Sequence, residues 1–215
     1  SVLLGDYWLV KAMDNILASS AHGNEVIRIF SKTLSSLAEG EMLQLQKASS
    51  GDTEEEDYLR IIYSKTASLF ESTCVSAAIS VNAPEAWVEA VRNYAVSLGI
   101  AFQIKDDIFD YTGGKKIGKP VGIDLEEQKI TLPLLGALES ASDERASHIR
   151  NMLLNIQEHP EYKEDIVAFV KEEKGIEYAV SRLDEYVAKA VGALATLPDS
   201  REKDYLVKIA EFTAY

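Results

Sequence analysis

Apolar residues recur about every three to four positions along almost the whole chain, and strict alternation of apolar and polar residues is hard to find. This spacing places apolar side chains on one face of a helix, so the pattern predicts an all-α protein. The five prolines all lie near the ends of periodic segments, where helices tolerate them. We expect helices at residues 2–19, 23–48, 53–81, 84–111, 129–140, 143–157, 161–173, 176–194 and 199–213.

These helices favour a bundle of long, mostly antiparallel rods. A helix of about 25 to 28 residues spans about 40 Å, so several of them side by side can enclose a deep central cavity. No Pro/Gly/Ser-rich linker divides the 215 residues, so we expect residues 1–215 to form a single domain. Before the third helix, Thr53 and Glu56 have the spacing of a capping box.

A cluster of carboxylates lies near the end of the fourth predicted helix. Asp106, Asp107 and Asp110 occupy positions i, i+1 and i+4, so Asp106 and Asp110 lie one turn apart on one face. Carboxylates this close repel one another in a partly buried site until a proton or a divalent cation relieves the repulsion. Oxygen ligands suit Mg²⁺, which commonly binds one or two protein carboxylates together with substrate phosphates. The cluster therefore predicts a magnesium site.

A segment rich in glycine and lysine follows directly, at residues 112–128, and has no clear helical period. Glycines let backbone N–H groups approach an anion, and lysines supply mobile positive charge to phosphate oxygens. The pattern GxxxxGK[ST] of a P-loop is absent from the sequence. We expect an active-site loop that closes on diphosphate, with Lys119 inside it and Lys129 just after it.

A structural interpretation of the same aspartates is also open, because acidic pairs commonly occupy solvated helix faces. The surroundings favour a site: Phe102, Gln103 and Phe109 lie beside the aspartates within an apolar stretch. An aromatic face such as that of Phe102 can also stabilise a cation.

The net charge of −13 changes the expected partners. It argues against nucleic acid and against anionic membrane surfaces, both of which attract basic proteins. It also repels bare diphosphate, so divalent cations would have to mediate the binding of such a substrate. The apolar stretches are too short for a membrane span and nothing resembles a signal peptide, so a cytoplasmic location is expected.

Several motifs together carry a family resemblance. The stretch FQIKDDIFD at residues 102–110 is preceded by GDYWLVKA at 5–12, GEMLQL at 40–45 and YLRIIYSKTASLFESTC at 58–74, and is followed by GKPVGIDLEEQKITLPLL at 118–135. In this order the motifs resemble the C-terminal two thirds of all-trans polyprenyl diphosphate synthases, of the medium to long product type that includes octaprenyl diphosphate synthases. The motifs cover about residues 1–135, and the remainder follows by position.

The resemblance implies an isoprenoid synthase fold and a Mg²⁺-dependent prenyltransferase that joins isopentenyl diphosphate to an allylic prenyl diphosphate. It assigns Lys65 to the allylic diphosphate, Thr66 to developing positive charge, and Gln103 and Gln44 to the substrate. It also implies a homodimer. Without the family, Lys65 would equally fit a lysine that reaches water from an apolar helix face, and Gln103 would fit an ordinary interhelical hydrogen bond.

The first aspartate-rich motif of this family does not occur in the sequence, which starts at Ser1 almost directly at GDYWLVKA. We therefore expect that the N-terminal helices are missing and that these residues alone are inactive. Three alternatives stay open: a non-catalytic subunit of a heteromeric prenyl synthase, a helical protein like the terpene cyclases, and a plain helical interaction domain. The Gly/Lys-rich loop argues against the cyclase.

Overall fold

The computed structural model describes residues 2–19, 21–113 and 121–215 of the chain. Within these residues every regular element is a helix, which confirms the predicted all-α class. The elements in chain order are α1 (Val2–Leu17), α2 (Gly23–Ser50), α3 (Glu55–Ile62), the π-helical turn η1 (Tyr63–Ala67), α4 (Ser68–Ser80), α5 (Glu85–Thr112), α6 (Ile123–Glu126), α7 (Leu132–Ser140), α8 (Asp143–Leu154), α9 (Tyr162–Glu172), α10 (Gly175–Ala193), the 3₁₀ turn η2 (Leu194–Thr196) and α11 (Arg201–Ala214).

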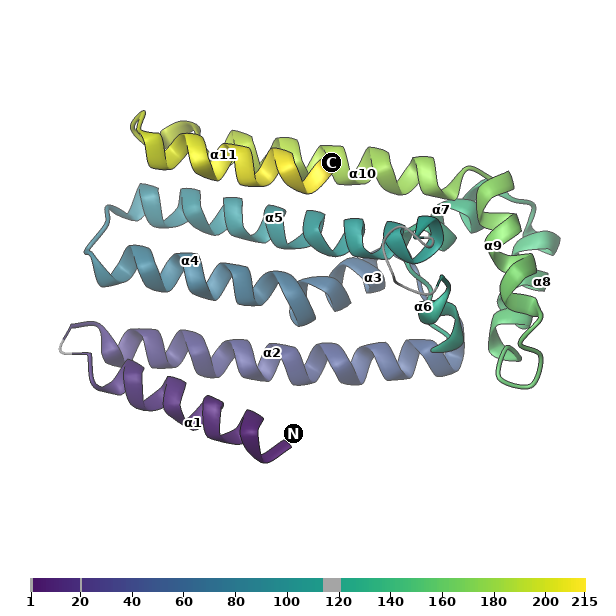
Figure 1. The fold of residues 1–215 in the computed structure, drawn as a ribbon, viewed down its shortest axis with the longest axis horizontal. Helices are drawn as coiled ribbons and strands as arrows, with labels where there is room; N and C mark the ends of the chain where they lie inside the picture. The colour runs from purple at the N-terminus through teal and green to yellow at the C-terminus, as the bar shows by residue number, and fades with distance from the viewer. Residues whose placement is uncertain (1, 20, 114–120) are drawn as a thin grey trace.

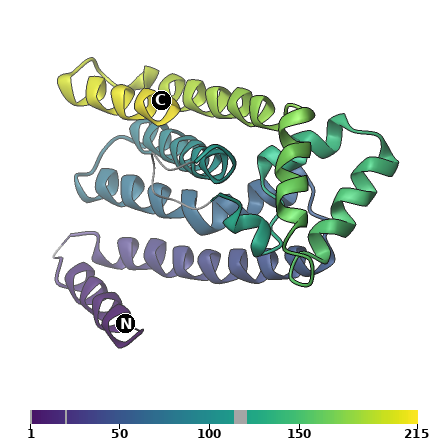
Figure 2. The same cartoon turned by 45° about the vertical axis from the view of Figure 1, so that its right-hand side comes forward.

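The long helices lie side by side and alternate in direction. Figure 1 shows α2, α4, α5 and α10 as successive antiparallel rods, with α11 packed beside α10 and α5. The short helices α8 and α9 lie across one end of this bundle, and the turned view in Figure 2 shows them at the same end. The C-terminal end of α5 points toward that end, so the acidic cluster lies where the bundle meets the short helices.

The hydrophobic core is centred on α5 and the helices that flank it. Ile104 on α5, Leu183 on α10 and Leu132 on α7 are all essentially inaccessible to solvent. Burying an aliphatic side chain of this size contributes about 1.5–3 kcal/mol, so these contacts hold α5 firmly between α4 and α10. The acidic end of α5 is therefore presented on a rigid element.

The predicted helices are present, with three differences. The predicted helix at 53–81 is interrupted by the π turn η1, which separates α3 from α4. A short helix, α6, lies in the segment that we expected to be a loop. The predicted capping box of Thr53 and Glu56 is wrong by one residue: the backbone N–H of Glu54 donates to Asp57 Oδ2 at 3.1 Å. The Thr53 carbonyl accepts a hydrogen bond from Arg150 instead, so Thr53 ties the start of α3 to α8.

Helix α1 differs from the rest of the bundle because none of its residues is buried. Its apolar side chains, including Leu3 and Trp8, are exposed, and α1 packs along α2 (Figure 1). Over the described ranges, no helix combines the length and the hydropathy that a bilayer crossing requires.

Candidate active site

A cavity of about 120 Å³ lies between α2, α3, η1, α5 and the segment that links α6 to α7. Six of the residues that we predicted from the sequence line it. They are Gln44, Lys65, Thr66, Gln103, Asp107 and Lys129. The fold thus brings together side chains from positions 44 to 129 in one partly enclosed space.

The π turn η1 places Lys65 and Thr66 on the cavity wall. A π turn inserts one residue into a helix and widens it locally, and such turns are frequent at functional sites. Helix α2 approaches the turn closely at Gly40, where an added Cβ atom would lie 2.6 Å from the Ser64 Cβ and 3.0 Å from the Lys65 Cγ. The glycine therefore allows α2 to lie directly against the turn.

The ammonium group of Lys65 is held by two groups from α2. Its Nζ donates to Gln44 Oε1 at 2.9 Å and forms an ion pair with Glu41 Oε2 at 2.5 Å. Gln44 and Lys65 are thus neighbours in the structure. Sequence reasoning missed Glu41, although Glu41 and Gln44 are three residues apart and share one face of α2.

Two further lysines line the same cavity. Lys129 pairs with Asp124 Oδ1 at 3.2 Å and with Glu127 Oε2 at 2.5 Å. Lys47 on α2 pairs with Asp57 at 2.8 Å. Lys47 and Asp124 were not predicted as site residues. Lys47 lies outside the quoted motifs, and Asp124 lies within the motif at 118–135, where only the lysines were chosen. Lys119 falls outside the described residues.

A chain of hydrogen bonds joins η1 to the acidic end of α5. The Thr66 hydroxyl donates to Gln103 Oε1 at 2.8 Å, and Gln103 Nε2 donates to Asp107 Oδ1 at 2.9 Å. The Tyr58 hydroxyl on α3 donates to the other carboxylate oxygen, Asp107 Oδ2, at 2.7 Å. Tyr58 was also missed, although it lies about two helical turns before Lys65.

Asp107 is buried, with 3% of its surface exposed. Burial raises the pKa of Asp107 from 3.8 to about 7, and repulsion from Asp124 acts in the same direction, against the lowering effect of its hydrogen bonds. A cation near Asp107 and Asp124 would lower the pKa of Asp107 and so oppose both effects. The two carboxylates lie on the same cavity, and one or two carboxylates are what a magnesium site usually takes from a protein.

The other two aspartates of the motif lie elsewhere. Asp106 is exposed and lines an open apolar groove beside α11, together with Phe102 and Phe109. Asp110 is buried, and its two oxygens accept the backbone N–H groups of Ile123 and Asp124 at 3.0 and 3.2 Å. Across the residues whose placement is described, no three His, Cys, Asp or Glu side chains form a group arranged to hold a metal ion.

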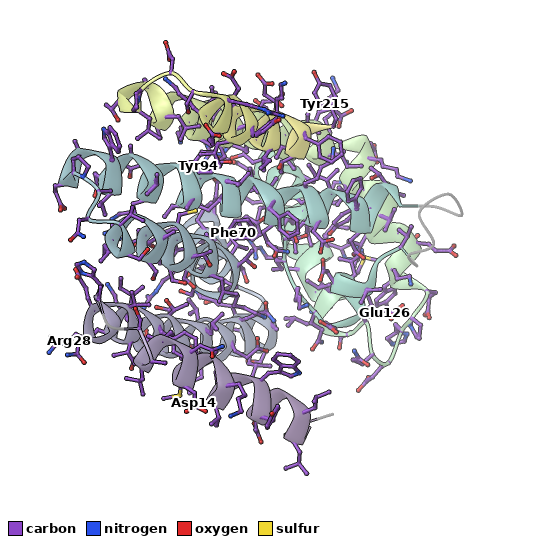
Figure 3. The ribbon with its side chains drawn as sticks, turned by 60° about the vertical axis from the view of Figure 1, so that its left-hand side comes forward. Asp14, Arg28, Phe70, Tyr94, Glu126 and Tyr215 are labelled. Atoms are coloured by element: carbon purple, nitrogen blue, oxygen red, sulfur yellow. The ribbon has the colours of Figure 1, made fainter. Side chains whose placement is uncertain are left out.

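Phe102 lies next to the cavity, not in it. It is half exposed, and its ring packs against that of Phe70 on α4 with a centroid distance of 5.7 Å. Phe70 and Phe102 line an open apolar groove with Ile209 and Phe212 of α11, so the predicted aromatic face is directed toward that groove. Figure 3 shows Phe70 on α4, below α5.

The helical bundle and this cavity define the class of the protein. The family model for polyprenyl synthetase matches residues 1–170, so the chain belongs to that family. The resemblance read from the motifs is confirmed.

Individual relatives agree with this assignment. The chain is 37% identical over 211 residues to octaprenyl diphosphate synthase from Haemophilus influenzae, covering 98% of this chain and 63% of that protein. A polyprenyl synthase from Caulobacter crescentus, solved in complex with calcium and isoprenyl diphosphate, aligns with a TM-score of 0.89 at 30% identity, over 99% of this chain and 65% of that one. Geranylgeranyl pyrophosphate synthase from Bacteroides thetaiotaomicron aligns with a TM-score of 0.89 at 37% identity, over 99% and 70% respectively.

Proposed function

We propose that this chain forms the diphosphate-binding part of a Mg²⁺-dependent prenyltransferase that condenses isopentenyl diphosphate with an allylic diphosphate and extends an all-trans polyprenyl chain. The observation that carries the proposal is the meeting of Lys65, Thr66 and Gln103 with the buried carboxylate of Asp107 on one cavity. A lysine stabilises a departing diphosphate, and a carboxylate can hold a metal ion that does the same. A hydroxyl oxygen can stabilise an allylic cation.

The lysines would bind the diphosphate. Cleavage of the allylic C–O bond leaves a diphosphate with several negative charges, and preorganised cations lower the barrier by stabilising that charge. Lys65 and Lys129 line the cavity, and each is already held by carboxylates, so neither must be ordered when the substrate binds. We include Lys119 in this group on its sequence position alone.

The metal would be held by carboxylates of the second aspartate-rich motif. Asp107 and Asp124 line the cavity. Asp106 directly precedes Asp107 in α5 and lies on the exposed side of the helix. Bound Mg²⁺ would supply positive charge to the phosphate oxygens of the leaving group. We keep Asp106 and Asp107 as the first candidates for its ligands. Asp110 stays a predicted ligand as well; it does not line the cavity, and its two oxygens accept backbone N–H groups of Ile123 and Asp124.

The carbon cation would be stabilised by oxygen dipoles and aromatic faces. Thr66 offers hydroxyl oxygen at the cavity wall. We keep the aromatic face of Phe102 as a candidate on its sequence position, because its ring packs against that of Phe70 in a groove beside α11. The double bond of isopentenyl diphosphate then attacks the cation and forms the new C–C bond. The released diphosphate or a nearby base removes a proton, which restores a double bond in the extended chain.

The proposal is tested with the full-length protein. Purified protein, Mg²⁺, labelled isopentenyl diphosphate and an allylic diphosphate should yield extended prenyl diphosphates, which reversed-phase chromatography separates by length. A protein whose melting temperature ignores Mg²⁺ plus diphosphate, and which forms no product, would instead be a helical interaction domain. Chelation of Mg²⁺ should abolish product formation and restore the melting temperature of the unliganded protein.

We also propose a homodimer, because the resemblance to the polyprenyl diphosphate synthases implies one. Light scattering should report twice the chain mass. A wild-type protein of single-chain mass would contradict the dimer.

A further inference from the structure

Tyr58 is buried on α3 and contacts the motif on α5 from outside it. Only 3% of its surface is exposed, and its hydroxyl donates to Asp107 Oδ2 at 2.7 Å. The two residues are 49 positions apart in the sequence. The contact therefore joins α3, the helix that leads into η1, to the helix that carries the aspartates.

The hydrogen bonds around Asp107 have a fixed direction. A carboxylate accepts and does not donate, so the side chain of Gln103 must turn its Nε2 group toward Asp107 Oδ1, as observed at 2.9 Å. The Gln103 Oε1 atom then faces Thr66, and an amide oxygen can only accept. The Thr66 hydroxyl is consequently the donor in the 2.8 Å contact with Gln103.

This direction decides what Thr66 presents to the cavity. Its single hydroxyl hydrogen is used by Gln103, so the remaining capacity of the oxygen is that of an acceptor, with lone pairs and negative partial charge. A group of this polarity stabilises positive charge on a neighbouring carbon. With the hydrogen turned into the cavity, the same side chain would oppose that charge.

Tyr58 lies at the other end of this series of hydrogen bonds. With its hydroxyl on Oδ2, the carboxylate of Asp107 is held with Oδ1 toward Gln103. Removing that donor leaves a buried carboxylate oxygen without its partner, and the side chain can rotate to find another. The Gln103 amide would then lose the acceptor that fixes its orientation. The Thr66 hydroxyl would lose, in turn, the fixed amide oxygen to which it donates.

We propose that Tyr58 is a positioning residue for prenyl transfer, which acts through Asp107 and Gln103 to keep the Thr66 oxygen turned toward the reacting carbon. The inference rests on the proposed function of the cavity. Tyr58 itself does not act on substrate, because its hydroxyl is engaged by Asp107.

The test compares Tyr58→Phe with a matched control. Tyr94 on α5 is also buried, at 2% exposure, and its hydroxyl donates to the Leu206 carbonyl at 2.9 Å, where α5 meets α11. Figure 3 shows this residue on the side of α5 that faces α11, far along the helix from its acidic end. Tyr94→Phe therefore removes a buried hydroxyl of the same kind without touching the cavity.

In the full-length protein, Tyr58→Phe should lower kcat about tenfold or more, with KM for both diphosphates within about twofold, because the hydroxyl direction matters chiefly once charge develops. Tyr94→Phe should leave kcat within about twofold. The side-chain amide resonances of Gln103, assigned by their loss in Gln103→Met, should shift in Tyr58→Phe and stay in place in Tyr94→Phe. In a Gln103→Met background, Tyr58→Phe should add little further loss.

The proposal is overturned by equal kcat in Tyr58→Phe and wild type, by equal losses in the two Tyr→Phe variants, or by Gln103 resonances that do not move. Additive losses in the double variant would also overturn it. Failure of the proposed function looks different: the wild-type protein then makes no prenyl product.

Discussion

Gly99 on α5 lies directly against Ala67, the last residue of η1, so that a Cβ atom at position 99 would lie 2.6 Å from the Ala67 Cα. The Ala67 Cβ would be at 2.9 Å. Neither atom belongs to a flexible side chain, so a larger residue must displace backbone. The close approach lets Thr66 in η1 reach Gln103 on α5.

Gly99→Ala should therefore destabilise the protein by about 1–3 kcal/mol, the usual cost of overpacking. It should also separate the Thr66 and Gln103 side chains and lower turnover. Urea unfolding followed by circular dichroism gives the free energy of unfolding.

Gly192→Ala on α10 is the control, because an added Cβ there meets no atom within 4 Å. In an exposed helical position this change should stabilise by roughly 0.5–1 kcal/mol. Equal effects of the two substitutions would contradict the role of Gly99.

Asp107 should make stability depend on pH. Folding raises its pKa from 3.8 to about 7, mainly through burial, so the folded chain holds this proton more tightly than the unfolded chain does. The stabilisation from that proton is fully present below the lower pKa and is lost as the pH rises toward 7. Asp107→Asn removes the titration, and its amide can accept from Gln103 and donate to the Tyr58 oxygen.

We therefore take the free energy of unfolding of Asp107→Asn minus that of wild type. This difference should increase by up to a few kcal/mol as the pH rises from about 4 to about 8. Turnover of the full-length variant should fall by about a hundredfold or more. Parallel pH profiles for the two proteins would show that Asp107 is ionised throughout this range.

Helical periodicity was sufficient to predict the helices and hence the class of fold, because burial of one apolar face decides where a long helix forms. It was not sufficient for the π turn, because Tyr63–Ala67 leaves the α-helical path where Gly40 and Gly99 allow two other helices to approach. Contacts between distant segments set that geometry. Helix α6 has only residues Ile123–Glu126, which is too short to show a period.

The candidate site was predictable as far as a motif marked it. Lys65, Thr66, Gln103 and Asp107 were named from the sequence, and the structure brings them to one cavity. Tyr58 begins the motif at 58–74 but was not chosen, because a tyrosine on an amphipathic helix usually packs in the core. Its polar contact with Asp107 depends on how α3 meets α5.

Lys65→Ala should weaken the binding of an allylic diphosphate about tenfold to a hundredfold, the value of one charged hydrogen bond. The loss of stability should be small, because the Lys65 side chain is 29% exposed and its partner Glu41 is 50% exposed. Calorimetry with a thiodiphosphate analogue and Mg²⁺ measures the affinity.

Lys203→Ala provides the comparison, because Lys203 pairs with Asp199 at 3.0 Å outside the cavity. This change should leave the affinity unaltered. A Lys65→Ala variant that melts early but binds normally would mean that Lys65 is only a lysine reaching for water along an apolar face.

Asp106 should contribute mainly to activity, and Asp110 should contribute mainly to stability. Asp110 accepts the N–H groups of Ile123 and Asp124 at the start of α6, so Asp110→Ala leaves partly buried donors unsatisfied and should cost about 1–3 kcal/mol. Asp106 is exposed, so Asp106→Ala should lower the free energy of unfolding by less than Asp110→Ala does. If Asp106 binds the metal, the same substitution should lower turnover by about a hundredfold or more and raise the Mg²⁺ concentration needed for half-maximal rate.

For Asp110→Ala the Mg²⁺ requirement should stay close to that of wild type, because the predicted loss lies in the folding of α6. A large increase in the Mg²⁺ requirement of Asp110→Ala would contradict this division and indicate that Asp110 is a metal ligand.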